Sequence, residues 1–153
     1  MDDATIRKAR IQDVKPMHAL INECAARGEM LPRSMNNLYT RLREMTVAAG
    51  AEKLVGCCGL SICWEDLAEV RSLVVGQEQR GQGLGRTLVE TCLSEAVTLG
   101  IYRVFTLTYH VDFFGRLGFK TVDKDILPQK IWADCLDCHK FPDCDETAML
   151  IEL

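Results

Sequence analysis

Apolar residues recur along the chain with two spacings, one typical of strands and the other typical of helices. Residues 69–75 contain an apolar run rich in β-branched side chains, which predicts a buried strand. Residues 84–97 place apolar side chains four apart, which predicts a helix. These side chains are Leu84, Leu88, Cys92 and Ala96, flanked by Val89, Leu93 and Val97. The sequence RGQGLG at residues 80–85 joins the two elements, so a strand leads through a glycine-rich turn into a helix.

The same two spacings predict further elements on both sides of this unit. Before it, we expect a strand at residues 4–9, a helix at 12–27 that Asp13 caps, a helix from Ser34 through Met45, and strands at 46–51 and 53–64. After it, we expect a strand at 102–107, a short helix at 111–117, a strand beginning at Phe119 and a last strand at 148–153. Pro32 breaks the helical pattern and so places Arg33 on a loop. No repeat or long linker divides the chain, so we expect a single domain over residues 1–153.

Composition narrows the class of protein. The chain has 153 residues, of which 48% are hydrophobic, enough for a sizeable core. A formal net charge of −4 gives no overall attraction to nucleic acid or to an anionic membrane. No apolar run approaches the ~20 residues of a membrane span, and the first ten residues are charged where a signal peptide would be apolar. We therefore expect a soluble, cytoplasmic protein without nucleic-acid or membrane partners.

The eight cysteines fit this setting as reduced thiols rather than as a disulfide framework. Five of them lie in apolar surroundings and are expected to behave as small core residues: Cys24, Cys57, Cys58, Cys63 and Cys92. The other three, Cys135, Cys138 and Cys144, could ligate zinc together with His139 or Asp145. A fourth ligand at a familiar spacing is missing, so we predict no bound metal and a loop of reduced thiols over the substrate side.

The glycine-rich turn is suited to binding a phosphate group. The first turn of a helix carries backbone N–H groups without intrahelical partners, and glycines let a ligand approach the backbone closely. A P-loop would need a Gly-Lys-Ser/Thr ending, which is absent, and a dinucleotide fingerprint would need glycine at position 86, which is Arg86. Both nucleotide interpretations are thereby weakened. A tight connection that binds nothing stays open.

The pattern Arg80-x-x-Gly83-x-Gly85 resembles the acyl-CoA pyrophosphate loop of the GNAT family of N-acetyltransferases. The order of the expected elements and the ending FFGRLGF at residues 113–119 are similar to that family too. The resemblance implies an α/β fold with a mixed central sheet of about six to seven strands, flanked by helices and splayed between its central pair. It also implies acetyl-CoA as co-substrate, bound by Leu73, Val74, Val75, Arg80, Gly81, Gln82, Gly83, Leu84, Gly85, Arg86 and Phe114.

Three segments are similar to short bacterial amino-acid N-acetyltransferases related to N-acetylglutamate synthase: residues 30–34, 69–73 and 132–146. This closer resemblance implies acetyl transfer to the α-amino group of an amino acid, with L-glutamate as the first candidate and arginine biosynthesis as the context. The larger synthases carry an amino-acid-kinase-like domain, for which 153 residues are too few. A small-molecule amine is thus the expected partner, and a homodimer is compatible with the resemblance. Acetylation of another amine, a non-catalytic acyl-CoA sensor and a metal- or redox-responsive module stay open.

Amine acetylation needs a base, because a free α-amino group is mostly protonated at neutral pH. Glu69 is the candidate base, and backbone N–H groups near residues 73–75 are the candidates to stabilise the oxyanion. Many acetyltransferases of the family that the chain resembles use a tyrosine to protonate the departing thiolate. Phe114 occupies that position here, and phenylalanine cannot donate a proton. Tyr109 is therefore the first alternative, with Ser72 and His110 after it.

A glutamate acceptor would bring two carboxylates, which arginine binds well through its two-pronged guanidinium group. Arg33 and Arg71 are the candidates, with Ser72 beside them as a further substrate-binding residue. Arg71 lies two residues from Glu69, so both side chains point to one face if this stretch is a regular strand. Either arginine could equally be an ordinary solvated surface residue.

Overall fold

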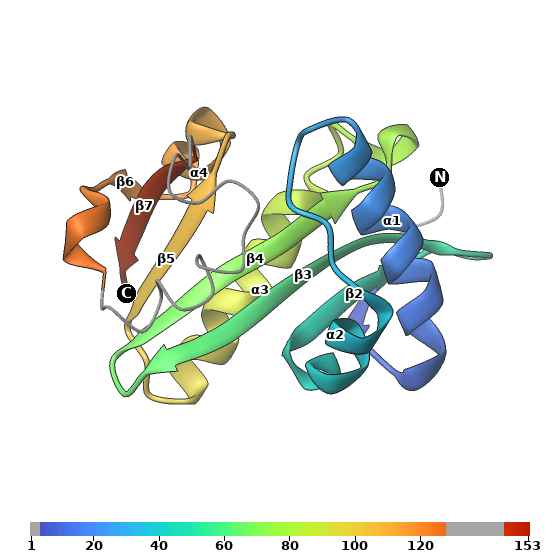
Figure 1. Ribbon diagram of the computed structural model, residues 1–153, viewed down its shortest axis with the longest axis horizontal. Coiled ribbons are helices and arrows are strands. Elements are labelled where there is room, and N and C mark those ends of the chain that lie inside the picture. The colour runs from blue at the N-terminus through green and yellow to red at the C-terminus, as the bar shows by residue number, and fades with distance from the viewer. Residues whose placement is uncertain (1–3, 128–145) are drawn as a thin grey trace.

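The computed structural model describes residues 4–127 and 146–153. Within these residues the strands form one seven-stranded sheet in the order β1-β2-β3-β4-β5-β7-β6 (Figure 1). Only the central pair, β4 with β5, is parallel there. The strands are β1 Thr5–Lys8, β2 Met45–Ala49, β3 Leu54–Trp64, β4 Leu67–Val75, β5 Arg103–Thr108, β6 Lys120–Thr121 and β7 Thr147–Glu152. The helices are α1 Val14–Ala26, α2 Met35–Thr40, α3 Leu84–Thr98 and α4 Val111–Arg116.

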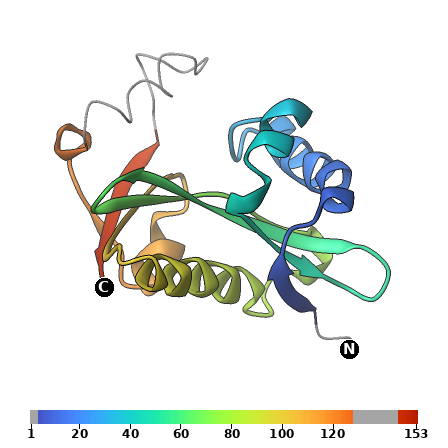
Figure 2. The ribbon, with the colours of Figure 1, turned by 90° about the horizontal axis from the view of Figure 1, so that it is seen from below.

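Helices cover both faces of the sheet. Figure 2 shows α1 and α2 on one side of the strands, with α3 and α4 on the other. One buried cluster joins the inner side of α3 to the sheet, and a second joins α1 and Leu38 of α2 to the opposite face. The predicted α/β class with a mixed sheet flanked by helices is therefore confirmed.

The two long helices bury the faces that their spacing predicts. In α1 the buried side chains are Val14, Met17, Ile21 and Cys24. In α3 they are Leu88, Val89, Cys92, Leu93 and Ala96, whereas Val97 is exposed. Gly28 and Gly100, just beyond the two helices, adopt left-handed φ values of 76° and 85°, which glycine accepts at little cost. The apolar stripes thus determine where each helix sits.

Two local expectations are wrong. Asp13 makes no capping bond to α1, because its carboxylate accepts from the Arg7 guanidinium at 2.6 and 3.1 Å and from the Arg10 backbone N–H at 2.7 Å. Ser34 does cap α2, accepting from the Asn37 backbone N–H at 3.0 Å, but this helix ends at Thr40. Met45 belongs instead to β2, where it pairs with Gly59 of β3.

The sheet divides where β4 meets β5. In the described chain these strands pair only at Ala68 with Val104 and at Glu69 with Phe105. One step further, the Thr106 hydroxyl donates to the Val70 carbonyl at 2.9 Å and takes the place of a ladder bond. Beyond this point the two strands diverge in Figure 1. The splayed central pair that the family resemblance implies is therefore present.

A β-bulge interrupts β4 next to the divergence. Opposite β3, Cys57 pairs with Val74 and Gly59 pairs with Arg71, so Ser72 and Leu73 together face the single residue Cys58. Ser72 takes a φ of 57°, the one positive value at a non-glycine residue in the described chain. The extra residue reverses the alternation of side chains, so Leu73 packs against the α3 cluster and Val74 joins the α1 cluster.

Candidate active site

A cavity of about 590 Å³ opens where β4 and β5 diverge. Three parts of the chain line it: the loop between α1 and α2, the stretch of β4 from Glu69 to Val75, and the end of β5 with α4. Arg80 and Gly85 of the glycine-rich turn line it as well. Acceptor and donor residues predicted from distant parts of the sequence thus share one cavity.

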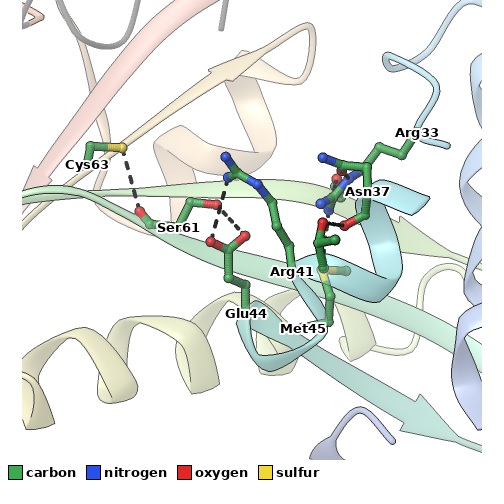
Figure 3. Close-up of polar contacts among 9 residues, drawn as sticks. Arg33, Asn37, Arg41, Glu44, Met45, Ser61 and Cys63 are labelled. Carbon is green, nitrogen blue, oxygen red and sulfur yellow. Dashed lines mark hydrogen bonds and ion pairs between the residues drawn. The ribbon is translucent and has the colours of Figure 1, made fainter. Parts of the chain in front are cut away.

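Arg33 lies on the α1–α2 loop and is buried, with 7% of its surface exposed. Figure 3 shows its guanidinium group directed toward Asn37 and Met45. Its Nε donates to Asn37 Oδ1 at 2.7 Å, and its Nη1 contacts Ser72 Oγ at 3.3 Å and Met45 Sδ at 3.4 Å. Its Nη2 is buried and has no hydrogen-bond acceptor among the residues that the structure describes.

Burial also makes the charged form of Arg33 less favourable. Removal from water lowers its pKa to about 10, and the positive charge of nearby Arg71 acts in the same direction. The group is still cationic at neutral pH. A buried cation with an unused N–H group beside a second arginine would gain strongly from an anionic partner. The alternative of a solvated surface arginine is therefore excluded for Arg33.

Glu69 and Arg71 both line the cavity, together with Val70 between them. Tyr109 and His110, just beyond β5, line it as well. The structure adds Glu146, which sequence reasoning missed. Because Thr108 pairs with Thr147 at the end of the β5–β7 ladder, Glu146 is brought to the same end of the sheet as Tyr109. No local sequence pattern indicated this long-range pairing.

On the donor side, residues 73–75 and Phe114 line the cavity. Gly81 and Gly83 have φ values of 83° and 80°, so the turn uses two left-handed residues directly before α3. A Cβ at Gly85 would lie 3.4 Å from the Phe113 ring, an ordinary van der Waals contact. This glycine-lined helix start beside an apolar wall suits the phosphate and pantetheine parts of acyl-CoA.

The other predicted donor residues lie outside the lining of this cavity. Gly81, Gln82, Gly83 and Leu84 belong to the turn and the first turn of α3, and the Arg86 guanidinium contacts Glu90 at 2.6 Å on the helix surface. Their contact with acetyl-CoA stays a prediction.

Cys24 and Glu29 also line the cavity, although sequence reasoning assigned Cys24 only to the core. The Cys24 thiol donates to Glu29 Oε2 at 3.3 Å, and Arg80 Nη2 contacts the same oxygen at 3.3 Å. Burial raises the pKa of Cys24, and the bonds from Cys24 and Arg80 lower the pKa of Glu29. Glu29 therefore ties the acceptor loop to the first residue of the glycine-rich turn.

Residues 4–127 and 146–153 hold no cluster of three or more His, Cys, Asp or Glu side chains that could bind a metal. No helix in these ranges is long and apolar enough to cross a membrane. The predictions for Cys135, Cys138 and Cys144 lie outside the described residues.

Comparison with known proteins identifies the family. A family model described as "Acetyltransferase (GNAT) family" matches residues 16–119. An uncharacterized N-acetyltransferase of Chlorobaculum tepidum is 39% identical over 148 residues, which are 97% of this chain and 96% of that protein. An amino-acid acetyltransferase of Mycobacterium tuberculosis is 34% identical over 121 residues, which are 77% of this chain and 69% of that protein.

A solved structure agrees with these matches. N-acetylglutamate synthase from Neisseria gonorrhoeae, complexed with coenzyme A and N-acetyl-glutamate, superposes with a TM-score of 0.89 at 26% identity. The match covers 98% of this chain and 35% of that one, so the chain spans about a third of that synthase. The protein belongs to the acetyltransferase (GNAT) family. It is thus an N-acetyltransferase that takes its acetyl group from acetyl-CoA, which confirms the predicted class of enzyme.

Proposed function

We propose that this enzyme acetylates the α-amino group of an amino acid, with L-glutamate as the first candidate. The observation that carries the proposal is Arg33, whose buried Nη2 has no acceptor in residues 4–127 and 146–153 and which lies near Arg71. Two arginines in one cavity match an acceptor that carries carboxylates. The names of the M. tuberculosis relative and of the N. gonorrhoeae synthase support the same substrate class. N-acetylation of L-glutamate would place the protein in arginine biosynthesis.

The cavity supplies a group for each part of this reaction. Glu69 would accept a proton from the acceptor amine, directly or through a water molecule. Backbone N–H groups of residues 73–75, which follow the bulge, would stabilise the negative charge that develops on the carbonyl oxygen. Tyr109 would protonate the departing thiolate, because Phe114 carries no acidic proton.

The direct test is acetyl-CoA turnover with a panel of amines, followed through the released thiol. We expect turnover with L-glutamate and slower turnover with L-glutamine or L-aspartate. The Glu69→Gln variant should retain acetyl-CoA binding and lose turnover by about 10²-fold or more, the usual contribution of a positioned base. Tight CoA binding without turnover of any amino acid would contradict the proposal and favour an acyl-CoA sensor.

A further inference from the structure

The bulge in β4 holds a strained residue that touches both halves of the cavity. Ser72 has a φ of 57°, a conformation that costs a residue with a Cβ atom about 1 kcal/mol or more. Ser72 also lines the cavity, between Arg71 on the acceptor side and Leu73 on the donor side. Strain of this kind persists only where surrounding contacts hold the residue in place.

Two contacts hold Ser72, one on its side chain and one on its backbone. Its Oγ accepts from Arg33 Nη1 at 3.3 Å. Its carbonyl oxygen accepts from the Cys57 thiol at 3.5 Å, which compensates for the regular ladder pairing that the bulge disrupts. Burial raises the pKa of Cys57 to about 12, so this thiol keeps its proton at neutral pH and stays a donor.

We propose that Ser72, braced by Cys57, is a positioning residue that couples acceptor binding at Arg33 to the backbone that receives the acetyl carbonyl. The proposal rests on the proposed function, since it takes the carboxylate of an amino acid as the ligand of Arg33. A carboxylate bound to Arg33 in the cavity would fix the guanidinium group, and Nη1 of the same group would fix Ser72 and the bulge after it. Each substrate should then strengthen the binding of the other by the same factor.

Calorimetry with a ketone analogue of acetyl-CoA, which cannot transfer its acetyl group, measures this coupling. The readout is the ratio of the Kd values of the analogue without and with saturating L-glutamate. We expect about fivefold tighter binding with L-glutamate, the size of one net hydrogen bond. The Ser72→Ala variant should reduce the ratio to near one. The Ser72→Gly variant, which accepts a positive φ without strain but also lacks the hydroxyl, should do the same.

Cys57 is tested by removal and by rescue. The Cys57→Ala variant should lower the coupling ratio, and the Cys57→Ser variant, which keeps a donor to the Ser72 carbonyl, should restore it. The Cys92→Ala variant is the matched control, since it removes a buried thiol from α3 on the other side of the sheet. The Cys92→Ala variant should lose about as much thermal stability as the Cys57→Ala variant and keep the coupling ratio of the natural protein.

A second readout separates this proposal from the proposed function. The infrared carbonyl stretch of the bound analogue reports hydrogen bonding to that oxygen and needs no amino acid. The Ser72→Ala and Cys57→Ala variants should move the stretch toward its value in water, whether or not L-glutamate is the acceptor. If L-glutamate does not bind, this shift still decides the proposal. An unchanged stretch would overturn it, and so would a coupling ratio equal to that of the natural protein in both variants when L-glutamate does tighten analogue binding to the natural protein.

Discussion

Replacement of Arg33 by methionine should separate substrate binding from stability. Methionine fills a similar apolar volume but carries no charge and no N–H groups. In the natural protein Arg33 is 7% exposed, and its buried Nη2 has no acceptor within the described residues. Replacement of this cation therefore removes the penalty for burying a charge, and it also removes several contacts.

The penalty of the buried charge and the stabilisation from the Arg33 contacts are of similar size. The lowering of the pKa of Arg33 to about 10 corresponds to a penalty of about 3 kcal/mol for keeping the cation in the folded state. Because the folded state is the one that binds this proton more weakly, the penalty is fully present at neutral pH. Against it stand the contacts with Asn37, Met45 and Ser72, together worth about 2–4 kcal/mol. We expect the free energy of unfolding to change by no more than about 1 kcal/mol.

The activity should change far more than the stability in the Arg33→Met variant. An arginine that binds a substrate carboxylate contributes about 2–5 kcal/mol, so kcat/KM for L-glutamate should fall by about 30-fold to several thousandfold. Urea unfolding and steady-state kinetics on the same preparations measure both effects. The Arg43→Met variant is the control, because Arg43 is exposed and should leave both quantities nearly unchanged. A strongly destabilised Arg33→Met variant with normal kcat/KM would show that Arg33 is structural and refute the reasoning.

Three further predictions follow from other described contacts. The Glu69→Gln variant should lose kcat and retain its Kd for CoA by calorimetry; loss of CoA binding instead would place Glu69 on the donor side. The Arg7 bond holds the pKa of Asp13 below its usual value, so the stability that this carboxylate adds is present above about pH 4 and is lost as the pH falls below it. Urea unfolding should show the Asp13→Asn variant about 2–3 kcal/mol less stable at pH 7, with a smaller difference at pH 3; an equal difference at both values would exclude the ionised pair as the cause. The Gly83→Ala variant should lose about 1 kcal/mol because of its φ of 80° and raise the KM for acetyl-CoA, whereas Gly115→Ala within α4, where a Cβ has open space, should do neither.

The sequence was sufficient for elements whose pattern is local. The spacing of apolar residues in α1 and α3 predicts both helices and the faces they bury, because burial of one stripe is what stabilises a surface helix. The turn glycines at positions 81 and 83 were also readable, since left-handed backbone strongly favours glycine. Arg33 was correctly placed on a loop, because Pro32 precedes it.

Features that depend on long-range contacts could not be predicted from the sequence. Met45 fits a helical spacing as well as a strand, and its pairing with Gly59 decides in favour of β2. Asp13 could cap α1 by sequence, but Arg7 is a stronger partner in space. The bulge at Ser72 leaves no mark in the run of residues 69–75, because the pairing with β3 creates it. The same holds for Cys24, Glu29 and Glu146 in the cavity wall.

The identity of the acceptor is the central claim, and a competition experiment tests it most directly. The enzyme is given acetyl-CoA and an equimolar mixture of the amino acids, a polyamine and a short peptide, and the acetylated products are quantified by mass spectrometry. Early product ratios equal the ratios of kcat/KM for the competing amines. We expect N-acetylglutamate as the main product, with its share falling sharply in the Arg33→Met variant. A main product from the polyamine, which has no carboxylate, would contradict it.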